Sequence, residues 1–214
     1  MPKSPGERVS RFAPELRENR GPGDCEICGG HRAFQAFNAK GLPKNDPRFR
    51  VQRCPDCGYG WTDPAPADSE IGRWYPKEYY GKENVRFNPL FERLTRWFRR
   101  RRAQEIVSRV RTGRVLDVGC GRGLILGTLK EWGWETHGVE LSEDAAWHAS
   151  RRMGATMHVG DFVSARFEPA SFDAIVFWHS LEHFRRPVDA LLHAHRLLRK
   201  GGLLVVAVPN SDSL

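Results

Sequence analysis

The sequence contains no long apolar run. Nowhere in its 214 residues do the ~20 consecutive apolar residues that span a bilayer occur. The N-terminal segment is polar and lacks the apolar stretch of a secretory signal. Only five cysteines are present, and four of them form C-x-x-C pairs, which does not suit a disulfide framework. These absences exclude a membrane or secreted class and predict a cytoplasmic protein without a membrane partner.

What is present is typical of a globular chain, with 40% hydrophobic and 28% charged residues. The length allows one ordinary domain plus a small accessory domain, and it is sufficient for a core without disulfides. Residues 1–24 are rich in Pro, Gly, Arg and Glu and predict a flexible tail. Residues 61–112 predict an aromatic connector followed by an amphipathic basic helix over residues 89–110, which Gly113 ends.

The net charge of +8 is compatible with a nucleic-acid partner. Much of it comes from Arg93, Arg96 and residues 99–102 of the basic helix. An anionic partner and a solvated helix face both account for this run. We favour the solvated face because no aromatic platform is interleaved on it, and nucleic acid is therefore the less favoured partner.

Residues 25–60 contain two cysteine pairs, Cys25 with Cys28 and Cys54 with Cys57, each followed by glycine. Tetrahedral Zn²⁺ accepts four thiolates, and such turns bring two sulfurs together. A redox dithiol would need only one pair in a βαβ setting. We therefore expect a zinc ribbon in which all four cysteines bind Zn²⁺. The role of this zinc is structural, since four protein ligands leave no open position for catalysis.

From residue 113 onward, short apolar segments alternate with helical ones. Strands are expected over residues 114–118, 136–140, 156–159, 172–178 and 203–208, with helices over 124–132, 142–153 and 188–198 between them. Ser142 is placed to cap the second of these helices and Gly154 to end it, whereas Gly201 and Gly202 close the third. The alternation predicts an α/β fold with a Rossmann-like, doubly wound parallel sheet of five strands in the order 3-2-1-4-5.

A glycine-rich turn over residues 119–123 follows the first of these strands and opens a helix. Glycines there let the backbone approach a ligand closely. A dinucleotide site wants its pyrophosphate at the helix N-terminus, and the third glycine of that fingerprint would fall on Leu124. Asp117, just before the turn, is poorly suited to a pyrophosphate but well suited to the ammonium of a methionine moiety. The charge therefore favours S-adenosylmethionine (SAM) over NAD.

Further candidates follow the next two strands, at the edge where ligands bind in open α/β sheets. Glu140 can accept hydrogen bonds from both hydroxyls of a ribose. Asp161 is placed for the adenine amino group and the Phe162 ring for packing against adenine, although Asp161 can equally cap a helix. The full set of expected cofactor-binding residues is Asp117, Gly119, Cys120, Gly121, Glu140, Leu141, Asp161, Phe162 and Trp178.

Residues 178–183 leave the fourth strand at the same edge, so their side chains are expected to face the substrate. His179 or His183 is a candidate catalytic general base near neutral pH. Either histidine can instead serve only as a hydrogen-bonding group at a helix start, and Trp178 can be a packing residue.

Residues 113–214 resemble the class I SAM-dependent methyltransferases. The resemblance rests on the segments VLDVGCGRG (115–123), GVELS (138–142), GDF (160–162), FDAIVFWHSLEHF (172–184) and LRKGGLLVVAVPN (198–210). It implies that Asp117, Gly119 and Gly121 line the methionine side of SAM, that Glu140 holds the ribose, and that Asp161 with Phe162 holds the adenine. The last two segments are similar to enzymes that act on quinones, sugars and other metabolites, which implies a small-molecule acceptor.

The segment from Cys25 to Tyr59, with the aromatic group Trp74, Tyr75, Tyr79 and Tyr80, resembles the zinc-ribbon leader of many bacterial methyltransferases. A ribbon also precedes some ribosomal-RNA methyltransferases. An RNA methyltransferase that uses the ribbon and the basic helix is therefore the alternative function.

The sheet of this family usually has seven strands, whereas the present sequence ends just past the fifth. We accordingly expect a SAM-binding domain over residues 113–214 that is incomplete at its C-terminus and has an exposed apolar edge strand. A partner chain that supplies the missing strands is one reading of this feature. A non-catalytic SAM-binding or zinc-ribbon interaction module is a third candidate function.

Overall fold

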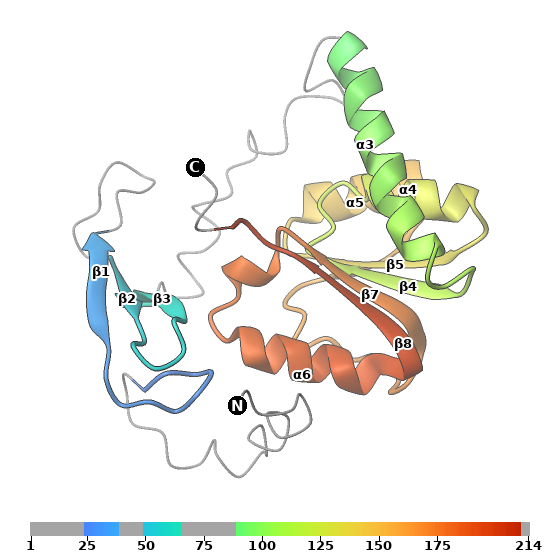
Figure 1. Ribbon diagram of the computed structural model, residues 1–214. Helices are drawn as coiled ribbons and strands as arrows, with labels where there is room; N and C mark the ends of the chain where they lie inside the picture. Colours follow the sequence, from blue (N-terminus) through green and yellow to red (C-terminus); the bar gives the residue numbers. More distant parts are fainter. Residues whose placement is uncertain (1–23, 39–48, 66–88, 211–214) are drawn as a thin grey trace. The chain divides into compact units, whose positions relative to one another are not determined.

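The computed structural model describes residues 24–38, 49–65 and 89–210 (Figure 1). The chain divides into two compact units, residues Met1–Trp74 and Tyr75–Leu214. The expected tail and the connector aromatics Trp74, Tyr75, Tyr79 and Tyr80 lie outside the described residues.

The first unit contains a small antiparallel sheet of three short strands, β1 (Phe34–Asn38), β2 (Arg50–Arg53) and β3 (Gly60–Asp63), in the order β1-β2-β3. One cysteine turn precedes β1, and the other joins β2 to β3. Its buried apolar side chains among the described residues are Cys25, Phe49 and Cys54. A core of this size stabilises a fold weakly, which is why domains this small commonly need a metal or disulfides.

The second unit is built on a parallel sheet with the strands β4 (Arg114–Val118), β5 (Glu135–Glu140), β6 (Thr156–Val159), β7 (Phe172–Trp178) and β8 (Leu198–Ala207). Their spatial order is β6-β5-β4-β7-β8, and every neighbouring pair is parallel. This order confirms the predicted 3-2-1-4-5 arrangement and the doubly wound α/β fold.

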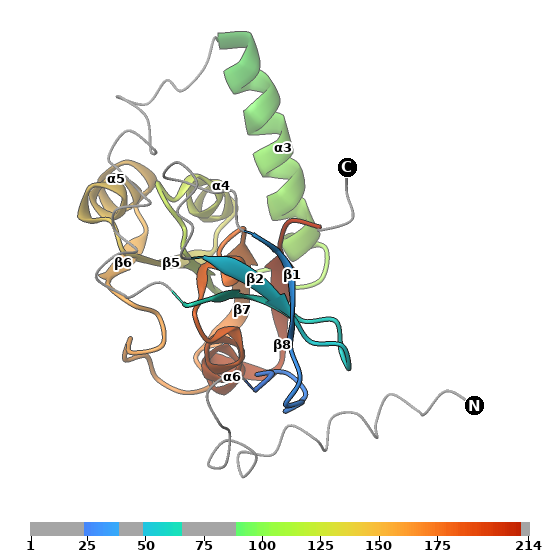
Figure 2. The same ribbon diagram turned by 90° about the vertical axis from the view of Figure 1, so that its left-hand side faces the viewer.

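Helices cover both faces of this sheet (Figures 1 and 2). One face carries α3 (Pro89–Val107), α4 (Leu124–Glu131) and α5 (Glu143–Met153), and the other carries α6 (Pro187–Leu197). A short 3₁₀ helix, η4 (Leu181–His183), follows β7. The capping prediction for α5 is confirmed: the Ser142 side chain accepts a hydrogen bond from the Ala145 N–H, and Gly154 ends the helix with φ 69°.

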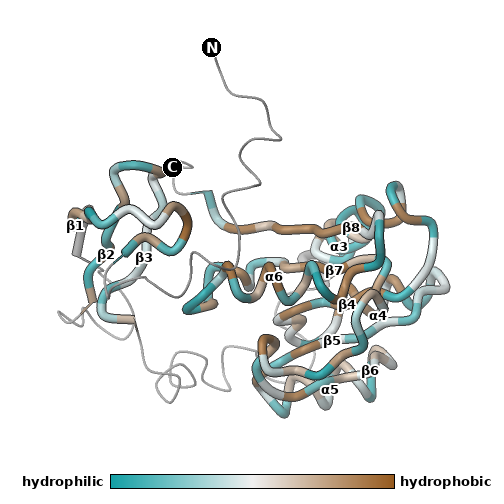
Figure 3. Tube along the Cα trace, turned by 90° about the horizontal axis from the view of Figure 1, so that it is seen from below, coloured by the Kyte–Doolittle hydropathy of each residue, from teal (hydrophilic) through white to brown (hydrophobic). Residues whose placement is uncertain are grey.

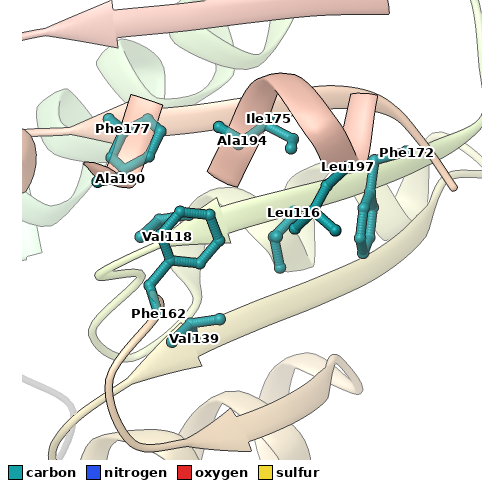
Figure 4. Packing of buried hydrophobic residues seen from close by; sticks show 10 residues of the cluster. All are labelled: Leu116, Val118, Val139, Phe162, Phe172, Ile175, Phe177, Ala190, Ala194 and Leu197. Atoms are coloured by element: carbon teal, nitrogen blue, oxygen red, sulfur yellow. The ribbon is translucent and has the colours of Figure 1, made fainter. Parts of the chain in front are cut away.

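Alternate residues of the central strands face opposite layers. Leu116, Ile175 and Phe177 pack toward α6 in the cluster drawn in Figure 4. Val115, Ala174 and Val176 pack toward α3 and α4, together with residues such as Ile106 and Leu129. Both faces of the sheet are therefore buried, as continuous apolar strands require.

The boundary between α6 and β8 differs from the prediction. Helix α6 ends at Leu197, and β8 begins at Leu198 rather than at Leu203. Gly201 and Gly202 consequently lie inside the strand instead of closing the helix. Leu198 pairs with Phe172 and Leu203 with Ala174, so the strand makes an excursion between them, and Gly201 supports it with φ 78°.

Two exposed apolar features complete the second unit. Strand β8, brown along most of its length in Figure 3, is an outer strand of the described sheet, and Leu204, Val206 and Val208 are exposed. On α3, Ala103 and Ile106 are buried, whereas Leu94, Trp97 and Phe98 remain about half exposed. Over the side chains that the structure describes, residues 93–107, the apolar stripe predicted for this helix is therefore buried toward its C-terminal end. In the described part of the chain, no helix has the length and apolar character needed to cross a membrane.

Candidate functional site

The candidate site lies at the carboxyl ends of β4, β5, β6 and β7. The chain leaves β4 toward β5 on one side and reaches β7 on the other, so the winding of the sheet reverses between β4 and β7. Open α/β sheets bind ligands at such a switch point. The residues predicted from the sequence follow the strands at this edge.

The glycine-rich turn after β4 adopts a conformation that side chains disfavour. Gly119, Gly121 and Gly123 have φ angles of 73°, 54° and 70°. A Cβ atom on Gly119 would lie 2.7 Å from the Cβ of Ser180, which follows β7. The turn after β4 and the loop after β7 are thus in contact, so the two sides of the switch point converge.

Two buried carboxyl groups lie beside this turn. Asp117 is 4% exposed and Glu140 is 6% exposed. The Glu140 carboxylate accepts hydrogen bonds from the Gly121 N–H at 2.8 Å and the Ser142 N–H at 3.0 Å. Asp117 Oδ1 is buried and has no hydrogen-bond partner among the described residues. Burial, and then the charge of Glu140, raise the pKa of Asp117 from 3.8 to about 7.

These features fit the methionine and ribose parts of SAM. A buried carboxyl without a partner for one oxygen is costly unless a cation or a hydrogen-bond donor reaches it, and an ammonium group supplies both. Glu140 is held in place by two backbone N–H groups beside the turn. The close contact of Gly119 with Ser180 leaves no room for a side chain at the narrowest point. The structure thus brings Asp117, Gly119, Gly121 and Glu140 together.

Two further predicted cofactor residues differ in exposure: Leu141 is exposed, whereas the Cys120 thiol is packed beneath the turn. Leu141 is 61% exposed next to Glu140, where an apolar group of a ligand could cover it. The Cys120 thiol points back toward Gly138, since a Cβ atom on that glycine would meet the Cys120 sulfur at 2.7 Å. Burial, followed by the charges of Asp117 and Glu140, raises the pKa of Cys120 well above its usual value. Cys120 is therefore a neutral packing residue beneath the turn.

The Phe162 prediction for the adenine end needs correction, whereas the Asp161 prediction stays a prediction. The Phe162 ring is 2% exposed and contacts the rings of Phe177, Phe184 and His193, so it is a core side chain and cannot pack against adenine in this conformation. Asp161 accepts a hydrogen bond from the Ser164 N–H at 2.9 Å, which is the capping role considered as its alternative. Phe162 is buried because it packs in the apolar core between the sheet and α6, together with Ala190 and Ala194.

The loop after β7 carries both candidate general bases. The His179 N–H donates to the Ala207 carbonyl at 2.8 Å, and the residue has φ 53°. The His179 side chain is half exposed, with Nδ1 lying 3.7 Å from Glu182 Oε1. His183 is also exposed, and its N–H donates to the Ser180 carbonyl at 3.0 Å. Both side chains are accessible to a substrate at this edge.

Two residues of this region, Ser180 and Arg102, lie within segments that the sequence indicated but had no individual role assigned. Ser180 is buried, and its Oγ has no hydrogen-bond partner in the described part of the chain. The Arg102 guanidinium lies over the Trp178 ring, 4.6 Å from its centroid. Trp178 packs on the α3 and α4 face of the sheet, which agrees with its alternative role as a packing residue. In the sequence, Arg102 resembles the other arginines of residues 99–102. Its contact with Trp178 is distant along the chain and no local pattern indicates it.

The four cysteines of the first unit form a separate candidate metal site. Their sulfur atoms all lie within 4.8 Å of one another, and the Cys25–Cys57 and Cys28–Cys54 sulfurs are each 3.5 Å apart. A Zn²⁺ tetrahedron with ~2.3 Å bonds has sulfur–sulfur edges of about 3.8 Å, so the four sulfurs are gathered near the spacing that such a site requires.

The two cysteine turns have the same hydrogen-bond pattern. The Gly29 N–H donates to the Cys25 carbonyl at 2.8 Å, and the Gly58 N–H donates to the Cys54 carbonyl at 2.9 Å. Both glycines have positive φ angles. Desolvation and the neighbouring thiols raise the pKa of Cys57, whereas backbone N–H groups of the second turn and the neighbouring thiols lower the pKa of Cys54. The four thiols thus compete for negative charge, which a bound cation relieves.

Comparison with known proteins gives a family and a fold. A family model described as a methyltransferase domain matches residues 86–214. An uncharacterised 37.1 kDa protein in transposon Tn4556 of Streptomyces fradiae is 35% identical over 106 residues, which are 46% of this chain and 31% of that protein. A ubiquinone biosynthesis O-methyltransferase of Paraburkholderia phymatum is 30% identical over 105 residues, which are 46% of this chain and 45% of that enzyme.

Among solved structures, the PH0226 protein of Pyrococcus horikoshii OT3 is 24% identical, with a TM-score of 0.51, over 65% of this chain and 62% of that chain. At this level of identity the likeness concerns the fold alone. The chain spans less than half the length of the curated relatives it matches.

Proposed function

Because the chain belongs to the methyltransferase-domain family, within class I of the SAM-dependent enzymes, we propose that it binds SAM at the carboxyl ends of β4 and β5 and methylates a small molecule. The observation that supports this most strongly is the buried pair Asp117 and Glu140 beside the glycine-rich turn. The Asp117 carboxylate accepts hydrogen bonds from the ammonium group of the methionine part, and the Glu140 carboxylate accepts hydrogen bonds from the ribose hydroxyls. When bound, SAM supplies a methyl group on a sulfonium leaving group.

The protein's own part is to hold the acceptor in line, exclude water and take up a proton where the acceptor carries one. His179 is our first candidate for the proton acceptor, because its exposed ring follows β7 directly and lies near the Glu182 carboxylate. His183, one turn further along, is the second candidate. The small-molecule acceptor is supported by the relative named as a ubiquinone biosynthesis O-methyltransferase. The exposed Leu141 side chain and the backbone at residues 161–162 contact the adenine end of SAM in this proposal.

Calorimetric titration of SAM tests the cofactor site. Glu140→Gln is expected to weaken SAM binding at least about tenfold, because charge-assisted hydrogen bonds to the ribose are lost. Glu135→Gln is the matched control: Glu135 lies at the opposite end of the same strand and its side chain is exposed. Equal affinities in Glu140→Gln and the wild type, or preferential binding of NAD, would remove the proposed site.

We also propose that Cys25, Cys28, Cys54 and Cys57 bind one structural Zn²⁺ in the first unit. The sulfur distances and the paired turns support this assignment. Four thiolates complete the tetrahedral coordination, so the metal takes no part in methyl transfer.

A further inference from the structure

The switch point has two chemically different sides. One side, at β4 and β5, carries the buried carboxyl groups of Asp117 and Glu140. The other side, at the end of β7, carries hydrogen-bond donors without acceptors: Trp178 Nε1 and Ser180 Oγ are buried and unpaired within the described residues. Arg102 of α3 lies on the Trp178 ring on this second side.

Arg102 is held in an unusual position for an arginine. It is partly buried, and its guanidinium stacks on an indole at 4.6 Å, which fixes its plane and reduces its hydration. In the described ranges of the chain no carboxylate pairs with it. By contrast, Arg100 pairs with Glu131, and Arg101 stacks on the exposed Trp97. Arg102 thus carries a charge that no carboxylate of the described residues compensates, and it lies on Trp178 at the end of β7.

A second positive charge lies close by. Burial, and then the charge of Arg99, lower the pKa of Arg102 from its usual value. The Arg102 guanidinium is thus partly buried and feels a second positive charge, which makes it a favourable partner for an anion. Phe98 lies one helical turn before Arg102 on the same side of α3 and is half exposed, so an apolar group can lie next to the charge.

We propose that Arg102 binds an anionic group, a phosphate or a carboxylate, of the methyl acceptor. This inference rests on the proposed function, because it names the class of substrate that the same site takes. Arg102 sits on Trp178, the residue directly before His179, and the following Ser180 touches the glycine-rich turn. An acceptor held by Arg102 therefore lies beside the loop that faces SAM. The anionic group of the acceptor is therefore held on the β7 side of the switch point, away from the carboxyl groups of Asp117 and Glu140.

Phenyl phosphate and benzoate test the anion site, with phenol as their neutral counterpart. Calorimetric titration into the full chain is expected to give saturable binding of at least one anionic probe and none of phenol. The probe that binds identifies the anion as a phosphate or a carboxylate. Arg102→Gln is expected to weaken this binding at least about tenfold, the usual order for a lost charge-assisted hydrogen bond.

Two further variants make the result specific. Arg102→Met keeps an apolar side chain on Trp178 and is expected to lose the probe to the same extent as Arg102→Gln. Arg101→Gln removes the same charge from the neighbouring position and is expected to bind the probe like the wild type. Equal losses in Arg101→Gln and Arg102→Gln, or no binding of either probe to the wild type, would overturn the proposal.

SAM titrations separate this proposal from the proposed function. Arg102→Gln is expected to bind SAM as the wild type does, since Arg102 lies on the β7 side of the switch point. A wild type that fails to bind SAM would overturn the proposed function. A wild type that binds SAM but neither anionic probe would overturn the anion site alone.

Discussion

Asp117 is almost fully buried, yet one of its carboxylate oxygens has no partner in the described structure. Burial of an unpaired charge destabilises the folded protein when no ligand is bound. Such a destabilised group is expected where a ligand supplies the missing partner. The same burial disfavours the ionised form and raises the pKa of Asp117 to about 7. The unfolded chain releases the proton near pH 3.8, whereas the folded chain holds it to about pH 7. This carboxyl therefore stabilises the fold below pH 4, and its contribution is lost as the pH rises to 7.

Asp117→Asn is accordingly expected to change stability and binding in opposite directions. At pH 8 the amide removes a buried negative charge, and a shift of about 3 pKa units corresponds to roughly 4 kcal/mol as an upper bound. The free variant should therefore melt at a higher temperature than the wild type, while its affinity for SAM falls at least about tenfold. Thermal melts and SAM titrations at pH 8 measure the two effects. A variant that is less stable and binds SAM normally would contradict the role of Asp117.

At the scale of elements, the glycine-rich turn between β4 and α4 has two separate requirements. Gly119 needs a positive φ angle and also has no room for a Cβ atom, which would meet Ser180 at 2.7 Å. Gly133 has a positive φ angle of 87° but open space around it. Gly119→Ala and Gly133→Ala thus separate steric exclusion from backbone strain.

We expect Gly133→Ala to lower the free energy of unfolding by about 1 kcal/mol, which is the cost of the strained backbone alone. Gly119→Ala should lower it by roughly 2–4 kcal/mol, because the loop after β7 must also move. SAM affinity should fall in Gly119→Ala and stay unchanged in Gly133→Ala. Urea denaturation and SAM titration check the pair, and equal effects of the two substitutions would argue against contact between the turn and Ser180.

The two cysteine turns, one before β1 and one between β2 and β3, have the second testable requirement at this scale. The wild type is expected to contain about one zinc per chain, and Cys54→Ser should lose most of it because three thiolates leave the coordination incomplete. Cys120→Ser is the matched control, since Cys120 belongs to the second unit and packs against Gly138. Colorimetric zinc determination after extensive dialysis measures the content. Zinc retained by Cys54→Ser would show that the four sulfurs do not act as one site.

The elements also show what sequence patterns can and cannot predict. The strands at residues 114–118 and 172–178 agree with the prediction because buried parallel strands consist largely of continuous apolar residues. The outer strand at residues 156–159 also agrees, although it is only partly buried. The start of β8 was wrong because a Gly-Gly pair usually ends a helix. Here, pairing of Leu198 with Phe172, a contact far along the chain, determines the strand. The Phe162 ring and the stack of Arg102 on Trp178 likewise depend on tertiary packing that no local pattern contains.

For the whole molecule, two buried groups act in opposite directions on stability between pH 7 and pH 5. Protonation of Asp117 stabilises the folded state over this range, as derived above. Burial, and then the charge of Arg196, lower the pKa of His193 below its usual 6.5. Its contribution to stability is fully present above pH 6.5 and is lost as the pH falls toward the lower folded-state pKa, because the unfolded chain takes up the proton first. The two effects partly cancel in the wild type.

Removal of Asp117 should uncover the effect of His193. We expect the melting temperature of Asp117→Asn to fall more steeply between pH 7 and pH 5 than that of the wild type. His193→Gln, added to Asp117→Asn, should flatten the curve again, since the double variant lacks both groups. All three proteins retain the same cysteine cluster, so acid release of a metal affects them equally and cancels in the comparison. Melting curves at half-unit pH steps give the slopes. Parallel curves for Asp117→Asn and the wild type would mean that Asp117 is already ionised at pH 5 and that its pKa is not raised by burial.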